Sequence, residues 1–174
     1  MTNKTDKKRE DLRKRLIDAA ESAIRDGGLR GLKARDVTTK AGCALGGLYN
    51  AVQDLDQLVM LALAATYVDF ALDNTALWSA VFNHRLPAGS EVPDWHKADY
   101  PVLIAEIIAP LSLLRPDLPP DALQLRAQTL FASVHGVVQL AIHGRFVGAP
   151  LSMLKSEVAA LVDAMTRGIH LVEA

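Results

Sequence analysis

The stretch that most constrains this chain spans residues 32–58, where two short apolar patterns flank a single glycine. Val37 and Ala41 are four residues apart and therefore share one face of a helix. Gly42 follows at once, and a glycine with positive φ would end that helix and turn the chain. A second short helix is predicted at about residues 44–51. The pattern indicates a helix-turn-helix, whose second helix can lie in the major groove of DNA.

A set of small and apolar residues surrounds this motif: Leu16-Ile17-Asp18-Ala19-Ala20, Gly28, Ala41-Gly42, Gly46, Leu48-Tyr49 and Leu58. In these residues the chain resembles the tetracycline-repressor (TetR) family of transcription factors over roughly residues 10–62. Three positions depart from the family pattern. Ala44 replaces the Ser or Thr that caps the recognition helix, Val52 replaces a common Phe, and Leu55 replaces a phosphate-binding Lys.

We expect an all-α fold with two parts. Residues 1–53 would form a three-helix head that contains the helix-turn-helix, and residues 54–174 a larger helical bundle that binds an effector and dimerises. The apolar spacing predicts one long fourth helix over residues 55–82, with Asp54 as its N-cap. Residues 86–99 hold two prolines and a glycine and are expected to form a loop, and Pro101 is expected in the first turn of the helix that follows.

Charge is divided unevenly along the chain, although the formal net charge is only −1. Residues 1–53 hold 12 Lys/Arg and 7 Asp/Glu, and the remainder holds 7 and 13. A basic front part favours a polyanionic partner such as DNA. An ordinary solvated surface is the alternative explanation.

The candidate DNA contacts lie on and beside the second motif helix. Tyr49 is expected to reach a phosphate through its hydroxyl, Leu45 to touch a thymine methyl, and Asn50 to make a polar contact. The full predicted set is Lys33, Arg35, Lys40, Ala44, Leu45, Gly46, Gly47, Tyr49 and Asn50. Gly46 and Gly47 are expected to let the backbone approach the groove.

The candidate ligand site is placed between the fourth helix and a later long helix. Trp78 and Phe82 belong to the first, and Phe131, His135 and Gln139 to the second. An apolar pocket with a few polar groups is the usual form of a small-molecule site. Phe131 and His135-Gly136 also resemble the Trp-x-x-x-His-Gly signature of a TetR subgroup, with Phe in place of Trp. Core packing is an equal alternative for every one of these side chains.

The last helix suggests a subunit interface. Alternating steps of four and three residues connect Leu154, Val158, Leu161, Met165, Gly168 and Val172, and Ser152 is the predicted N-cap. Such a seam fits a four-helix interface between two copies, or packing within one chain. The TetR resemblance implies a homodimer through the last two helices.

No catalytic constellation appears in the sequence. It lacks a Gly-rich phosphate loop, a His-Glu zinc motif and a nucleophile elbow, so we expect no enzyme activity, no metal and no cofactor. Residues 127–144 carry no formal charge but too many polar residues for a membrane span. A cytoplasmic protein without membrane contact is expected.

The resemblance implies a ligand-responsive transcriptional regulator. A repressor that leaves a palindromic operator when a small, largely apolar effector binds is the first hypothesis. The second is a helical small-molecule- or protein-binding module that has lost DNA recognition, because Ala44 and Leu55 replace capping and phosphate-contact residues.

Overall fold

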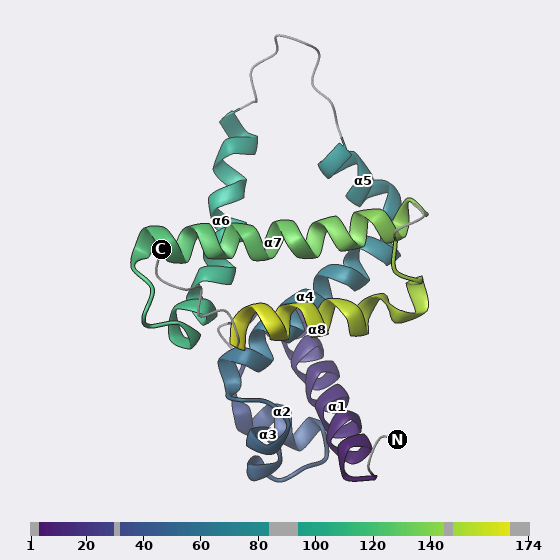
Figure 1. The fold of residues 1–174 in the computed structure, drawn as a ribbon, viewed down its shortest axis with the longest axis vertical. Helices are drawn as coiled ribbons and strands as arrows, with labels where there is room; N and C mark the ends of the chain where they lie inside the picture. The colour runs from purple at the N-terminus through teal and green to yellow at the C-terminus, as the bar shows by residue number, and fades with distance from the viewer. Residues whose placement is uncertain (1–3, 30–31, 84–93, 145–147, 168–174) are drawn as a thin grey trace. The chain divides into compact units, whose positions relative to one another are not determined.

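The structure is a computed structural model that describes residues 4–29, 32–83, 94–144 and 148–167. Every regular element in these ranges is a helix, which confirms the predicted all-α fold. The elements in Figure 1 are α1 (Lys4–Gly27), α2 (Ala34–Lys40), α3 (Leu45–Ala51), α4 (Leu55–Asp73), α5 (Thr75–Asn83), α6 (Asp94–Leu114), α7 (Pro120–Ile142), the 3-10 turn η2 (Leu151–Met153) and α8 (Leu154–Arg167).

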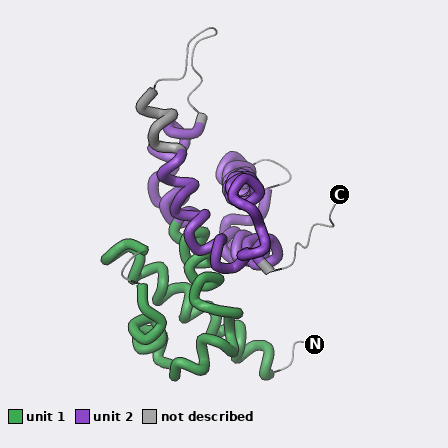
Figure 2. Tube along the Cα trace, turned by 90° about the vertical axis from the view of Figure 1, so that its left-hand side faces the viewer, with its two compact units in different colours: residues 1–66 green, residues 67–174 purple. Residues whose placement is uncertain are grey.

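The chain divides into two compact units, residues 1–66 and 67–174, which Figure 2 colours separately. The division falls inside α4, so this helix belongs to both units. The functional boundary predicted after residue 53 lies just before α4 begins, so either division leaves the three helices α1–α3 together.

In unit 1, helices α1, α2 and α3 pack against one another. Leu16 and Ala20 of α1, Val37 of α2 and Leu48 of α3 are each 1% exposed or less. These four side chains form the core of the helix-turn-helix head, and their burial fixes which face of α3 remains available to a partner.

The turn between α2 and α3 is built as the sequence predicts. Gly42 has φ of 65°, in the left-handed region that suits glycine. The guanidinium of Arg15 on α1 donates a hydrogen bond of 2.8 Å to the carbonyl oxygen of Ala41, the C-cap of α2. A cation at this position satisfies an unpaired helix-end carbonyl and complements the helix dipole. Helix α1 therefore holds the turn that presents α3.

Helix α4 begins at a side-chain cap, which confirms the prediction for Asp54. The Asp54 carboxylate accepts a hydrogen bond of 2.8 Å from the backbone N–H of Gln57. In return, the Gln57 side-chain oxygen accepts a hydrogen bond from the backbone N–H of Gln53. This reciprocal arrangement is a variant of the capping box, and it fixes the first turn of α4.

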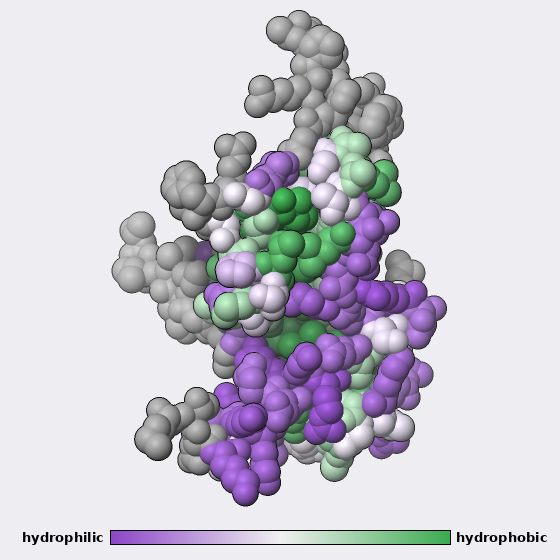
Figure 3. All heavy atoms as spheres, turned by 90° about the vertical axis from the view of Figure 1, so that its right-hand side faces the viewer, coloured by the Kyte–Doolittle hydropathy of each residue, from purple (hydrophilic) through white to green (hydrophobic). Residues whose placement is uncertain are grey.

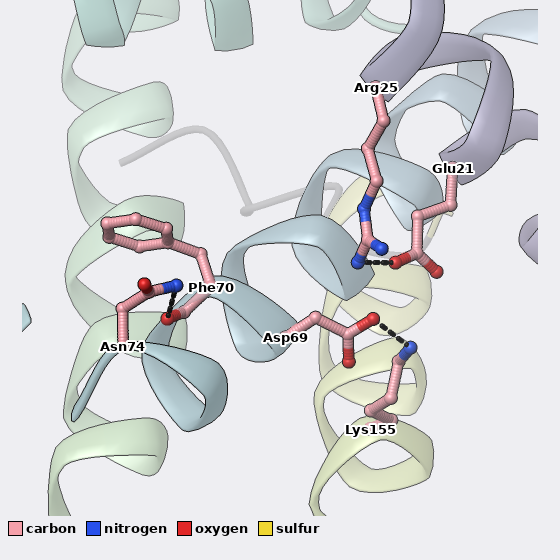
Figure 4. Close-up of polar contacts among 6 residues, drawn as sticks. All are labelled: Glu21, Arg25, Asp69, Phe70, Asn74 and Lys155. Carbon is pink, nitrogen blue, oxygen red and sulfur yellow. Dashed lines mark hydrogen bonds and ion pairs between the residues drawn. The ribbon is translucent and has the colours of Figure 1, made fainter.

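The prediction of one uninterrupted helix over residues 55–82 is wrong, because α4 and α5 are separated at Asn74. The Asn74 side-chain amide donates to the carbonyl oxygen of Phe70 at 3.2 Å, as Figure 4 shows. The Thr75 hydroxyl donates to the carbonyl oxygen of Ala71 at 3.0 Å. Side-chain donors that bond backbone carbonyls in this way compete with the helical ladder and bend helices.

In unit 2, α7 packs against both α6 and α8, and α6 also contacts α8. The end of α4 is joined to α8 by an ion pair, in which Lys155 Nζ lies 2.8 Å from Asp69 Oδ2 (Figure 4). The buried apolar side chains of these helices include Ile104, Ile107, Leu111, Leu130, Val134, Val138, Leu154, Val158 and Val162.

The loop predicted over residues 86–99 extends too far, because residues 94–99 belong to α6. Residues 86–93 lie outside the described ranges. Pro101, which the sequence places in the first turn of a helix, lies in the interior of α6. A proline here removes one N–H from the ladder. The buried side chains of Ile104 and Ile107 pack one and two turns later and hold the helix in place.

Three positions of the seam predicted on the last helix are buried within the chain. Leu154 and Val158 are 1% exposed or less, and Met165 is 8% exposed. The intrachain alternative therefore holds for these three positions, whereas Leu161 is half-buried and Gly168 and Val172 lie outside the described ranges. Ser152 is also not an N-cap, because it lies within η2, one residue before its end and two before α8 begins.

Candidate DNA-binding surface and ligand site

Helix α3 presents an uncharged face to solvent. Leu48 and Ala51 are buried, whereas Leu45, Tyr49 and Asn50 are exposed, with 55% of Tyr49 accessible. The chain carries no charged side chain from Ala41 to Gln53. Contacts from this face would therefore be made by a phenol, an amide and an apolar branch rather than by a cation.

The two glycines of α3 have different surroundings. A Cβ atom at Gly46 would meet nothing within 4 Å, so this position is open to a partner's close approach. A Cβ at Gly47 would lie 3.5 Å from Cys43 and Leu12, in ordinary van der Waals contact. Gly47 therefore faces the packed side of the head, and only Gly46 matches the predicted role of leaving room for a groove.

The N-terminus of α3 lacks a side-chain cap. Ala44 occupies the N-cap position with an extended backbone and makes no capping hydrogen bond. A Ser or Thr at such a position typically contributes about 1 kcal/mol. The departure from the family pattern at Ala44 is thus a local loss of stability, and it leaves backbone N–H groups of α3 without that partner.

The cations predicted to contact DNA lie on or beside α2. Lys33 and Arg35 are exposed, and their side chains make no hydrogen bond or ion pair within the described part of the chain. Lys40 is different, because its ammonium group donates to the Ser22 hydroxyl and lies 3.9 Å from an Asp26 carboxylate oxygen. In this structure Lys40 is directed toward α1, so Lys33 and Arg35 are the freer candidates.

All five predicted ligand residues belong to unit 2, and four of them lie together. Trp78 and Phe82 of α5 lie beside Phe131 and His135 of α7, with the Phe82 and His135 rings centred 4.6 Å apart. The Trp78 and His135 rings are centred 5.1 Å apart, and the Phe131 ring stacks on His135 at 5.8 Å. We call Tyr67, Trp78, Phe82, Phe131 and His135 the aromatic cluster.

Tyr67 is the member that sequence reasoning missed. Its ring lies edge-on to Trp78, Phe82 and Phe131, with centroids between 5.7 and 6.5 Å away. Its hydroxyl lies 2.6 Å from His135 Nδ1 and accepts a hydrogen bond of 2.9 Å from the Trp78 indole. Tyr67 and His135 are 68 positions apart in sequence, so no local pattern connects them.

Burial keeps both polar members of the cluster neutral near pH 7. Desolvation lowers the pKa of His135 below its ordinary 6.5. Burial also raises the pKa of Tyr67 to about 12, opposed by the hydrogen bond from Trp78. The cluster thus combines apolar rings with a neutral imidazole and a neutral phenol, and its member Phe82 is 36% exposed.

Gln139 lies one turn beyond His135 on α7 and is half-buried. Its backbone carbonyl is 2.8 Å from His143 Nδ1. No group of three or more His, Cys, Asp or Glu side chains in the described ranges is placed to hold a metal ion.

Helix α4 is long and apolar enough to cross a membrane by length and composition, and it alone passes this test within the described ranges. Just over half of its apolar window, 56%, is buried inside the protein. Core helices of soluble proteins pass the same test. The composition of α4 is therefore weak evidence for a membrane span.

Comparison with known proteins gives one informative match. A family profile described as "Tetracyclin repressor-like, C-terminal domain" matches residues 60–168, more than half of the chain. The chain also aligns with a solved structure titled "Structure of a protein with unknown function from Rhodococcus sp. RHA1". The two share 25% sequence identity over 91% of this chain and 95% of the other, with a TM-score of 0.41. No curated protein matches the chain.

Proposed function

The chain belongs to the tetracycline-repressor (TetR) family, and on this premise we propose that it is a DNA-binding transcriptional regulator that responds to a small molecule. In the full proposal it is a cytoplasmic, non-enzymatic homodimer. It binds a palindromic operator as a repressor and leaves it when a small, largely apolar effector binds.

The observation that carries the DNA-binding proposal is the exposed face of α3. Leu45, Tyr49 and Asn50 project from a helix whose opposite face is buried, and α1 braces the preceding turn through Arg15. This is the arrangement that a recognition helix needs to enter a major groove. Lys33 and Arg35, one element earlier, are available for phosphates, which supply most non-specific affinity.

The aromatic cluster supports the effector proposal. It combines a largely apolar lining with two neutral polar groups, which is the usual composition of a small-molecule site. Tyr67 lies on α4, the helix that follows the head directly. An effector that altered the Tyr67–His135 contact would act on α4. If the effector bound one position of that helix more tightly than another, it would shift the protein toward that position and could release DNA.

The dimer proposal rests on exposed faces of the last two helices, in place of the buried seam. On α7 the exposed small or apolar residues Leu125, Ala132 and Leu140 recur at steps of seven and eight. On α8 Ala160 and Ala164 are exposed four residues apart. Figure 3 shows hydrophobic side chains gathered together on the face that it turns to the viewer. Two adjacent helices from each copy would form a four-helix interface.

Three observations on the head favour a second candidate function. The uncharged face of α3, the uncapped Ala44 and the engaged Lys40 all weaken the case for tight DNA binding. A helical module that binds a small molecule or a protein without DNA recognition would have these features.

Fluorescence anisotropy of a labelled random-sequence duplex, titrated with the protein at low and moderate salt, separates the two candidates. A regulator should bind at low salt and lose affinity steeply as salt rises. Tyr49→Ala should weaken binding roughly 10- to 150-fold, since a hydrogen bond to a charged group contributes roughly 1.5–3 kcal/mol. Tyr49→Phe tests whether the hydroxyl or the ring is responsible. No binding by the folded protein at low salt would favour the second candidate.

A further inference from the structure

In the aromatic cluster, only one assignment of donors and acceptors gives each polar hydrogen of Trp78 and Tyr67 a partner. An indole N–H can only donate, so Tyr67 Oη accepts from Trp78 at 2.9 Å. The single Tyr67 proton then has one acceptor in reach, His135 Nδ1 at 2.6 Å. If His135 donated from Nδ1 instead, the Tyr67 proton would have no partner in the described structure. Nδ1 is therefore the unprotonated nitrogen, and the proton of the neutral ring resides on Nε2.

The second ring nitrogen of His135 is left available. Nε2 makes no hydrogen bond to any described residue, and the side chain is half-buried. Nε2 is also not among the side-chain polar atoms that are both fully buried and without a hydrogen-bond partner. Within the described ranges, only the Thr66 hydroxyl is a fully buried side-chain polar atom without a partner. Nε2 thus retains some accessible surface beside the rings of Trp78, Phe82 and Phe131.

We propose that His135 Nε2–H is the donor to a neutral effector that carries a hydrogen-bond acceptor oxygen on a flat, apolar body, such as an aromatic ketone. The inference deepens the proposed effector site and rests on it. Ring contacts from Phe82 and Phe131 would hold the apolar body, and the donor would select the oxygen. A carboxylate is disfavoured, because the desolvation that lowers the pKa of His135 would also penalise a buried negative charge.

The direction of this donor distinguishes two ligand classes. In the Nε2–H tautomer, His135 donates a hydrogen bond and so selects carbonyl and ether oxygens, which accept it. The opposite tautomer would present a lone pair at Nε2 and would select hydrogen-bond donors such as phenols. Tyr67 and Trp78 decide between the two, so they are positioning residues for a specificity that His135 expresses.

The first arm of the test is nitrogen-15 NMR of the full chain with labelled histidine. Protonated and unprotonated ring nitrogens give well-separated signals, and a His135→Phe variant identifies those of His135. We expect the Nε2–H form in the wild type, with Tyr67→Phe shifting the population toward Nδ1–H. A wild-type Nδ1–H tautomer would overturn the proposal. If His135→Phe does not fold, single variants of the other four histidines identify their signals, and the remaining signals belong to His135.

The second arm compares acetophenone with α-methylstyrene, which has nearly the same shape but no acceptor oxygen. Because the two compounds leave water with different free energies, the informative quantity is the ratio of their Kd values, compared between proteins. This ratio should favour acetophenone about tenfold more in the wild type than in His135→Phe, as expected for one hydrogen bond. His143→Phe replaces an exposed histidine at the C-cap of α7, and this matched control should keep the wild-type ratio.

Equal ratios in the wild type and His135→Phe, or no binding of acetophenone to the folded wild type, would overturn the proposal. Neither arm contains DNA. Failure here is therefore distinguishable from failure of the proposed function, which the duplex titration measures.

Discussion

At the residue scale, the Asp54 carboxylate is expected to contribute measurably to stability, because it caps the helix that follows the head. Asp54→Ala removes the acceptor for the Gln57 N–H and should lower the free energy of unfolding by about 1 kcal/mol. Asp54→Asn keeps an acceptor oxygen in the same place and is the matched control. Denaturant unfolding followed by circular dichroism measures both. Equal losses in the two variants would show that charge, not capping, is responsible.

The lowered pKa of His135 makes a second residue-scale prediction. The unfolded chain binds a proton near pH 6.5, whereas the folded protein resists it until lower pH. Stability should therefore be complete above about pH 6.5 and fall as the pH drops toward the folded-state pKa. The pH dependence of the unfolding free energy should be shallower in His135→Phe than in the wild type. Identical slopes in the two proteins would contradict the assignment.

Residue-scale features were predictable where the physics is local. Asp54 precedes an apolar run, and Gly42 separates two short helical patterns, so both roles follow from adjacent residues. The partners of Tyr67 come from α5 and α7, and its role depends on tertiary packing that no short window contains. The contact of Lys40 with Ser22 could not be predicted for the same reason, since it crosses from α2 to α1.

At the scale of elements, α3 is expected to read thymine methyls through Leu45, which is 41% exposed. On a duplex that the protein binds specifically, replacing contacted thymines by uracil removes one methyl each. Every lost contact should weaken binding roughly fourfold, from about 0.8 kcal/mol per buried methyl. Leu45→Ala should bind the thymine and uracil duplexes alike. An undiminished preference for thymine in Leu45→Ala would assign the methyl contact elsewhere.

Helix α8 offers a matched pair of substitutions on its two faces. Met165 is 8% exposed and Ala164 is exposed. Met165→Asp should cost several kcal/mol of folding free energy, since it buries an unpaired charge. Ala164→Asp should leave the fold intact and shift the proposed dimer toward monomer. Circular dichroism and analytical ultracentrifugation separate the outcomes, and a stable Ala164→Asp dimer would exclude this face from the interface.

The sequence predicted that the elements are helices, but it did not predict where some of them begin and end. Apolar periodicity indicated helices throughout, as observed. The break at Asn74 depends on side chains of Asn74 and Thr75 that bond backbone carbonyls, which apolar spacing does not record. A proline is typical of the first turn of a helix, but α6 begins at Asp94, before Pro101. The seam of α8 was visible in the sequence, but its partner within the chain was not.

At the scale of the whole molecule, composition predicted a basic front part and an acidic remainder. That division matches a DNA-binding head followed by a part that DNA would repel. The family match begins at residue 60 and so covers the second part rather than the head. DNA recognition by residues 1–53 is consequently the part of the account that most needs a direct measurement.

That measurement is selection of bound duplexes from a random-sequence pool by the full-length protein, followed by sequencing. A dimeric helix-turn-helix regulator should enrich an inverted repeat whose half-sites are about 34–36 Å apart, one turn of DNA. Tyr49→Ala should enrich it poorly. Recovery of no preferred sequence by the folded wild-type protein, at salt low enough for phosphate contacts to hold, would contradict the central claim that this chain is a sequence-specific regulator.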